Sequence, residues 1–115
     1  MEKVDRFFMD KIEEVYSLCK KLEILELYFF GSAVNGKYIV GQSDLDILVN
    51  TEPHLVKNLV KLSIGLKKIY GCKVDTFHKR WRIPNELENH LAEFKVLIYQ
   101  DKNYAHNIAA SVNGL

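Results

Sequence analysis

Apolar side chains recur every three or four residues between Glu2 and Leu22, and charged residues fill the positions between them. This spacing puts the apolar side chains on one face of a helix, so it predicts an amphipathic α-helix over this range. The apolar positions are Val4, Phe7, Phe8, Ile12, Val15, Leu18, Cys19 and Leu22. Such a helix packs against a core, and we assign it no chemistry.

Four later segments are short, apolar and bounded by turn-forming residues, a pattern that predicts β-strands. They run from Leu25 to Phe30, Asp44 to Val49, Cys72 to Phe77 and Lys95 to Tyr99. A helical pattern fills the gap between the second and third strands, beginning near Thr51 to Pro53 and ending at Gly71. Its apolar positions are Leu55, Val56, Leu59, Val60, Leu62, Ile64, Leu66 and Ile69.

Strands that alternate with helices predict an α/β (α+β) fold, here a small mixed sheet of about four strands backed by helices. A short helix from Pro84 to Glu93 is expected before the last strand. Residues Asp101 to Leu115 lack clear periodicity, so they are expected to form a flexible tail or a segment that becomes ordered on a partner. The chain of 115 residues is expected to form one domain, residues 1–115.

Charge and cysteine content restrict the function. Sixteen basic and fifteen acidic side chains give a net charge of +1, which argues against a protein that binds nucleic acid through bulk charge. Cys19 and Cys72 lie far apart and have no metal-type spacing, so we expect reduced, buried thiols in a cytoplasmic protein. The sequence contains no signal peptide and no apolar run of membrane-spanning length, so no membrane association is expected.

Two carboxylates stand at alternate positions of the second predicted strand, Asp44 and Asp46. Because side chains alternate between the faces of a strand, both should project to one side, with Leu45 and Ile47 on the other. Neighbouring carboxylates repel each other, and a divalent cation relieves the repulsion; Mg²⁺ commonly takes one or two carboxylates plus waters and phosphates. A lone Asp-x-Asp is more often a solvated strand end, so the prediction depends on the accompanying turn.

That turn is Gly31-Ser32, which abruptly ends the first strand. Main-chain N–H groups at such a turn can bind phosphate oxygens, and Ser32 adds a hydroxyl. Lys37 is the only cation in the following loop. Residues 31–37 also match the start of a P-loop, but Tyr38 stands where Ser or Thr would hold Mg²⁺, so we judge this match accidental.

The combination of strand, Gly31-Ser32, loop and Asp44-x-Asp46 resembles the signature of the polymerase-β nucleotidyltransferase superfamily. The short chain is similar to its smallest branch, the minimal nucleotidyltransferases (MNT proteins) of HEPN–MNT toxin–antitoxin pairs. The resemblance covers Leu25 to about Tyr99, and the family's third acidic residue matches Asp75 on the third predicted strand. An exposed edge-strand residue is the alternative interpretation of Asp75.

The resemblance implies Mg²⁺-dependent transfer of AMP from ATP to a hydroxyl. Asp44, Asp46 and Asp75 would be the catalytic, metal-binding residues, with two Mg²⁺ ions during turnover. Candidate nucleotide-binding residues are Gly31, Ser32, Lys37, Ser43 and Arg80. Arg80 belongs to the run His78 to Arg82, which could equally be a solvated loop.

The chain departs from the family pattern after the turn. Family members commonly carry arginines there, whereas this chain has Ala33, Val34 and Asn35, and its loop from Ala33 to Ser43 is eleven residues, one longer than usual. Arginine binds phosphate in bidentate fashion, so its loss weakens the expected grip on a triphosphate. A catalytically weak antitoxin that acts by binding is therefore an alternative function.

The acceptor hydroxyl is the remaining question. No stretch of the sequence predicts a second domain that could hold a small acceptor, so we expect the acceptor on another protein. The resemblance implies a tyrosine of a helical HEPN toxin. A small-molecule transferase of the antibiotic-modifying type is a second alternative, in which a homodimer would complete the acceptor site.

Overall fold

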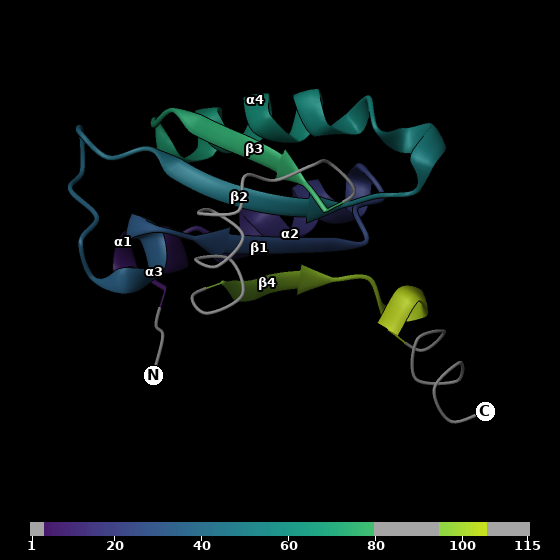
Figure 1. The fold of residues 1–115 in the computed structure, drawn as a ribbon, viewed down its shortest axis with the longest axis horizontal. Helices are drawn as coiled ribbons and strands as arrows, with labels where there is room; N and C mark the ends of the chain where they lie inside the picture. The colour runs from purple at the N-terminus through teal and green to yellow at the C-terminus, as the bar shows by residue number, and fades with distance from the viewer. Residues whose placement is uncertain (1–3, 80–94, 106–115) are drawn as a thin grey trace.

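Four strands form one mixed sheet in the computed structural model, which describes residues 4–79 and 95–105 (Figure 1). The strands are β1 (Glu26–Phe30), β2 (Leu45–Asn50), β3 (Val74–His78) and β4 (Val96–Gln100). Their order is β3-β2-β1-β4, with β1 antiparallel to both β2 and β4 and with β2 parallel to β3. The predicted four-stranded mixed sheet is confirmed.

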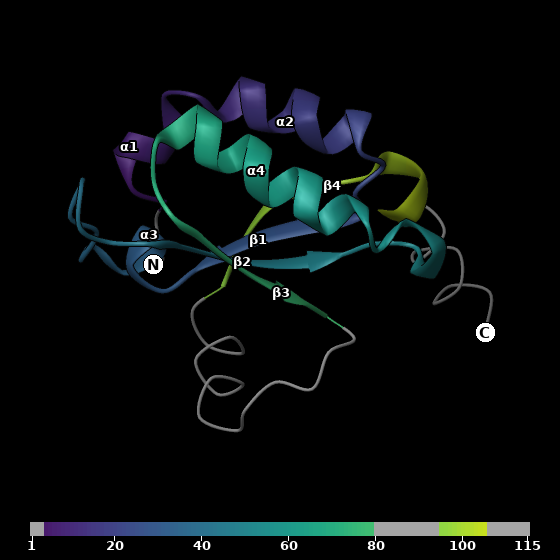
Figure 2. The ribbon, with the colours of Figure 1, turned by 90° about the horizontal axis from the view of Figure 1, so that it is seen from above.

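The longer helices lie together on one face of this sheet (Figure 2). They are α2 (Ile12–Lys21) and α4 (Asn58–Tyr70), and the short α1 (Arg6–Met9) precedes α2. A four-residue helix, α3 (Ser32–Asn35), follows β1, and a 3₁₀ turn, Pro53–Leu55, precedes α4. Helix α4 connects β2 to the parallel strand β3, and a parallel pair requires such a crossover. None of the helices described is long and apolar enough to cross a membrane.

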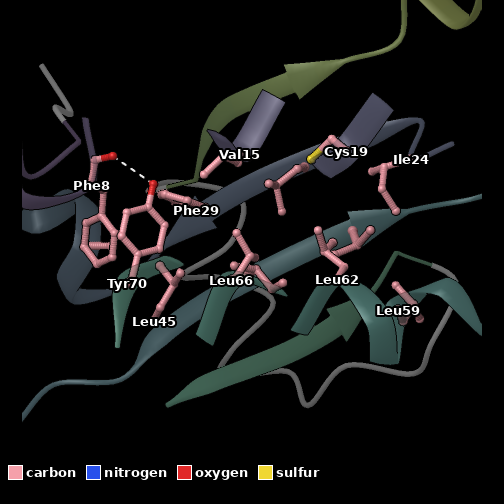
Figure 3. Packing of buried hydrophobic residues seen from close by; sticks show 14 of the residues in the cluster. Phe8, Val15, Cys19, Ile24, Phe29, Leu45, Leu59, Leu62, Leu66 and Tyr70 are labelled. Carbon is pink, nitrogen blue, oxygen red and sulfur yellow. Dashed lines mark hydrogen bonds between the residues drawn. The ribbon is translucent and has the colours of Figure 1, made fainter. Parts of the chain in front are cut away.

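The helical layer and the sheet enclose the hydrophobic core (Figure 3). Strand residues Leu27, Phe29, Leu45, Ile47 and Val49 are fully buried on this face. Because side chains alternate along a strand, the intervening residues face the opposite side, where Phe30 and Leu48 form a second, smaller cluster. Cys19 is buried as expected, and burial raises the pKa of its thiol to about 12, whereas Cys72 is only half-buried.

The predicted first helix is divided into α1 and α2. Asp5 caps α1 by accepting a hydrogen bond from the Phe7 N–H at 2.9 Å, and the Phe8 carbonyl accepts one from the Tyr70 hydroxyl at 2.8 Å. Phe8 is fully buried, and its ring meets that of Tyr70 at 4.8 Å. Packing of Phe8 therefore sets a break at Asp10 and Lys11 that the apolar periodicity did not reveal.

Other parts of the chain add to the sequence analysis. Val56, Val60 and Ile64 are apolar positions of the second predicted helix, but they are exposed. Residues 102–105 are helical, and the expectation of a flexible or partner-ordered segment from Asp101 stays a prediction. The expected helix from Pro84 to Glu93 and the tail beyond residue 105 lie outside the described residues.

Candidate active site

Asp46 and Asp75 lie side by side on the parallel strands β2 and β3. Leu45 and Ile47 are buried under the helices, so Asp46 projects to the other face of the sheet, as alternation predicted. Asp44 stands immediately before β2, and all three carboxylates are half-buried. The structure therefore brings the second and third predicted acidic residues, Asp46 and Asp75, together on neighbouring strands.

The electrostatics of Asp46 are unfavourable for a carboxylate. Burial raises its pKa to about 6, and the charges of Asp75 and Asp44 and a hydrogen bond with Asp75 raise it in the same direction. Within the described residues the ionised form thus lacks a compensating positive charge at neutral pH, and a cation would supply it.

The turn after β1 brings the backbone against this carboxylate. Gly31 precedes α3 with φ of 69° and ψ of −143°, a conformation that side chains disfavour. A Cβ atom at Gly31 would lie 2.5 Å from Oδ2 of Asp46. Glycine lets a ligand approach the main-chain N–H groups of the turn, and the structure adds a second reason for glycine, namely space for the Asp46 carboxylate.

Helix α3 explains part of the departure from the family pattern. Ser32 begins this helix and is half-buried, whereas Ala33 and Val34 are buried in the core. The Ala33 carbonyl accepts a hydrogen bond from the Asp5 N–H at 2.8 Å, which ties α3 to the segment before α1. A long charged side chain at position 33 or 34 would have to enter the core, whereas Asn35 is exposed.

The loop between α3 and β2 contains two of the other predicted residues. Lys37 is exposed. The Ser43 hydroxyl accepts a hydrogen bond from the Ile39 N–H at 2.9 Å, and the Ser43 N–H donates to the Ile39 carbonyl at 2.8 Å. Ser43 therefore closes a turn directly before Asp44.

Sequence reasoning missed the anchor of this loop, Tyr38. Its ring stacks on Phe7 at 5.6 Å and meets Phe8 edge-on at 4.7 Å, so the loop is attached to the core. An aromatic residue between the loop glycines Gly36 and Gly41 was the available signal. Arg80, the last predicted nucleotide contact, lies outside the described residues.

Among these residues, a pair of carboxylates is suited to bind a metal ion. Within residues 4–79 and 95–105, no group of three His, Cys, Asp or Glu side chains is arranged to hold a metal ion. The adjacent pair Asp46 and Asp75 nevertheless fits Mg²⁺, which is often bound by one or two carboxylates and completes its shell with water and substrate phosphates. Asp44 adds negative charge beside the pair.

Comparison with known proteins identifies the family. The sequence profile of the nucleotidyltransferase domain matches residues 11–103, most of the chain. The chain belongs to the nucleotidyltransferase domain family. Its Gly-Ser turn and paired carboxylates therefore lie within the matched domain.

Solved structures share this nucleotidyltransferase fold. The similarity to one toxin–antitoxin structure with AMP-PNP covers 90% of this chain and 87% of the chain in that structure, with a TM-score of 0.60 and 16% identity. A protein named as a minimal nucleotidyltransferase covers 76% and 89%, with a TM-score of 0.60 and 28% identity. An MNT antitoxin structure with a tri-AMPylated HEPN toxin of Shewanella oneidensis covers 92% and 83%, with a TM-score of 0.54 and 14% identity.

One relative that is similar in sequence is a cyclic nucleotide synthase. The cyclic nucleotide synthase CdnE01 of Staphylococcus haemolyticus is 35% identical over 77 residues, which are 64% of this chain. The aligned part is 26% of that protein, so the chain spans about a quarter of its length.

Proposed function

We propose that this nucleotidyltransferase transfers AMP from ATP to a tyrosine of a HEPN-type partner protein and acts as its antitoxin. The observation that carries the proposal is the register of β2 and β3, which sets Asp46 beside Asp75 next to the Gly31 turn. This arrangement gathers negative charge at one place on the sheet, with a pKa of about 6 at Asp46. A Mg²⁺–triphosphate would neutralise it.

Each of these residues then has a task. Asp46 and Asp75 would hold Mg²⁺, with the charge of Asp44 beside them, and the ion would neutralise charge on the triphosphate. Gly31 and Ser32 contact its phosphate oxygens. The tyrosine hydroxyl oxygen forms a bond to the α-phosphorus, the bond from that phosphorus to the bridging oxygen breaks, and pyrophosphate leaves. Asp75 accepts the hydroxyl proton.

The proposed nucleotide and partner draw support from the structural neighbours. One neighbour is a toxin–antitoxin structure with AMP-PNP, an ATP analogue, and another holds an AMPylated HEPN toxin. At 14–16% identity these likenesses establish the fold, so the acceptor in particular needs a direct test.

The test is to incubate this chain with its HEPN-type partner, ATP and Mg²⁺ and to weigh the partner by mass spectrometry. Each transferred AMP adds about 329 Da, a mass fixed by the nucleotide. Asp75→Asn should suppress the adduct while leaving the complex intact, because Asp75 is assigned to the chemistry. The matched control is Asp101→Asn, a half-buried aspartate beyond β4.

A binding-only antitoxin is the second candidate, favoured by the buried Ala33 and Val34 where family arginines stand. It predicts neutralisation of the toxin with no adduct on the partner. Neutralisation that survives Asp44→Asn, Asp46→Asn and Asp75→Asn would decide in its favour.

A further inference from the structure

Helix α4 and the segments around it carry a concentrated positive charge that catalysis does not use. Residues 53–74 contain five lysines and no aspartate or glutamate, although the whole chain has a net charge of only +1. Helix α4 covers the face of the sheet opposite the side to which Asp46 projects (Figure 2). The basic surface is therefore separate from the candidate active site.

Three of the chain's lysines surround a groove between α2 and α4. The groove has a volume of about 450 Å³ and is lined by Leu18, Lys21, Leu22, Asn58, Lys61, Ile64, Gly65 and Lys68. Gly65 contributes no side chain, so the Leu18 side chain approaches the α4 backbone. Among the described residues, the ion pair found is Lys79–Glu26, so Lys21, Lys61 and Lys68 have no acidic partner there.

An apolar stripe adjoins this groove at Ile64. Val60 and Ile64 lie four residues apart on α4, Val56 precedes them by the same interval just before the helix, and the exposed fractions of Val56, Val60 and Ile64 are 43%, 64% and 51%. Side chains four apart form a ridge on a helix, and such ridges pack into the grooves of a second helix. The lysines Lys57, Lys61 and Lys68 lie beside this ridge at helical spacing.

We infer that this surface of α4 and the adjoining groove bind an acidic amphipathic helix of a partner protein. Leucine-like side chains of that helix would cover Val60 and Ile64, and its carboxylates would contact Lys21, Lys61 and Lys68. Nucleic acid fits less well, because the apolar ridge offers nothing to phosphates and the groove lining contains no arginine and no aromatic side chain. The inference does not depend on the proposed transferase activity.

The test measures binding of a fluorescent synthetic helix of about 16 residues, with leucines every three or four positions and flanking glutamates, by anisotropy. Lys21→Glu, Lys61→Glu and Lys68→Glu together should weaken binding by about tenfold or more. Lys20→Glu, Lys73→Glu and Lys102→Glu change the net charge equally at exposed sites outside the groove, and should weaken it less than about twofold. Circular dichroism confirms the fold of both.

Two further arms sharpen the result. A peptide with lysines in place of its glutamates should bind the triple variant Lys21→Glu, Lys61→Glu, Lys68→Glu and not the wild type. Val60→Asp should weaken binding, while Val40→Asp, at a loop residue of nearly the same exposure (63%), should not. These single substitutions also decide the matter if the triple variant does not fold.

Several results would overturn the inference. One is that the wild type does not bind the peptide. A second is that both triple variants lose the same amount of peptide affinity. A third is that the protein binds an oligouridylate instead of the peptide and that this binding depends on the lysines. Any change in melting temperature on addition of Mg²⁺ and ATP should be the same in the wild type and in every groove variant, which keeps this test independent of the active site.

Discussion

Two acidic side chains mark opposite ends of the β1–β2 ladder, and the protein treats them differently. Glu26 pairs with Asn50 at one end, and Asp46 pairs with Phe30 at the other. Glu26 is only 3% exposed. Burial raises the pKa of Glu26, but hydrogen bonds from Lys79, Tyr28 and Asn50 and the charge of Lys79 outweigh it, so the pKa is lowered overall.

Asp46 has no such compensation in the part of the chain that the structure describes. Its neighbours on the adjoining positions are Asp75 and Asp44, which raise its pKa further instead of lowering it. The Lys79 ammonium lies 2.9 Å from Glu26, whereas within the described residues no cation pairs with Asp46. A carboxylate that is neutralised by other residues of the protein supports the fold, whereas one without such a partner is a candidate for a functional site.

The largest expected effect is on catalysis at the uncompensated end. Asp46→Asn should reduce AMP transfer by at least about a thousandfold, because a metal ligand is lost, while the chain stays folded. The measurement is the rate of adduct formation on the partner. Glu26→Gln is the matched change at the other end and should leave the transfer rate within about threefold. Equal losses would remove the distinction between the two ends.

Gly31→Ala should come next in size. The new Cβ would approach Asp46 Oδ2 to 2.5 Å, so the carboxylate must move, and ATP affinity in the presence of Mg²⁺ should fall by about tenfold or more. The control is Gly36→Ala, because Gly36 also has a positive φ, 81°, but nothing lies within 4 Å of its Cβ position. Isothermal titration calorimetry compares the two, and matching affinities would contradict the role given to Gly31.

A smaller effect is expected on stability at the compensated end. Lys79→Met leaves the buried Glu26 carboxylate without its cation and should lower the free energy of unfolding by about 1–3 kcal/mol. Lys73→Met, at an exposed lysine, should change it by less than about 0.5 kcal/mol. Urea denaturation gives both values, and adding Glu26→Gln to Lys79→Met should recover part of the loss.

The smallest effect is the pH dependence of stability. A carboxyl pKa raised from 3.8 to about 6 destabilises the folded state as pH rises through this interval, because the folded protein binds the proton more tightly. Without Mg²⁺, Asp46→Asn should therefore raise the melting temperature by about 5 °C at pH 7, with a gain that shrinks towards pH 4. A gain that is constant between pH 4 and pH 7 would contradict the assigned pKa.

The sequence predicted the strands and the side to which Asp46 projects well, because both depend on local pattern. Short apolar runs gave all four described strands, and alternation placed Asp46 opposite the buried Leu45 and Ile47. The pairing of Asp46 with Asp75 needed the family resemblance, since strand order is a long-range property that periodicity does not encode.

Other features depended on tertiary contacts and escaped the sequence. The break between α1 and α2 follows from Phe8 packing against Tyr70, and the loop anchor Tyr38 from its stacking on Phe7. The exposure of Val60 and Ile64 could not be foreseen, because an apolar residue on a helix looks the same in sequence whether it faces the core or an external partner.

The most direct test of the account is to titrate the side-chain carboxyl carbons of Asp46 and Glu26 by NMR in one sample, with and without Mg²⁺. We predict that Asp46 titrates near pH 6 without Mg²⁺ and at lower pH with it. Glu26 should titrate below 4.5 in both conditions. An Asp46 carboxyl that titrates near its ordinary value of 3.8 and does not respond to Mg²⁺ would contradict a cation site at this end of the sheet.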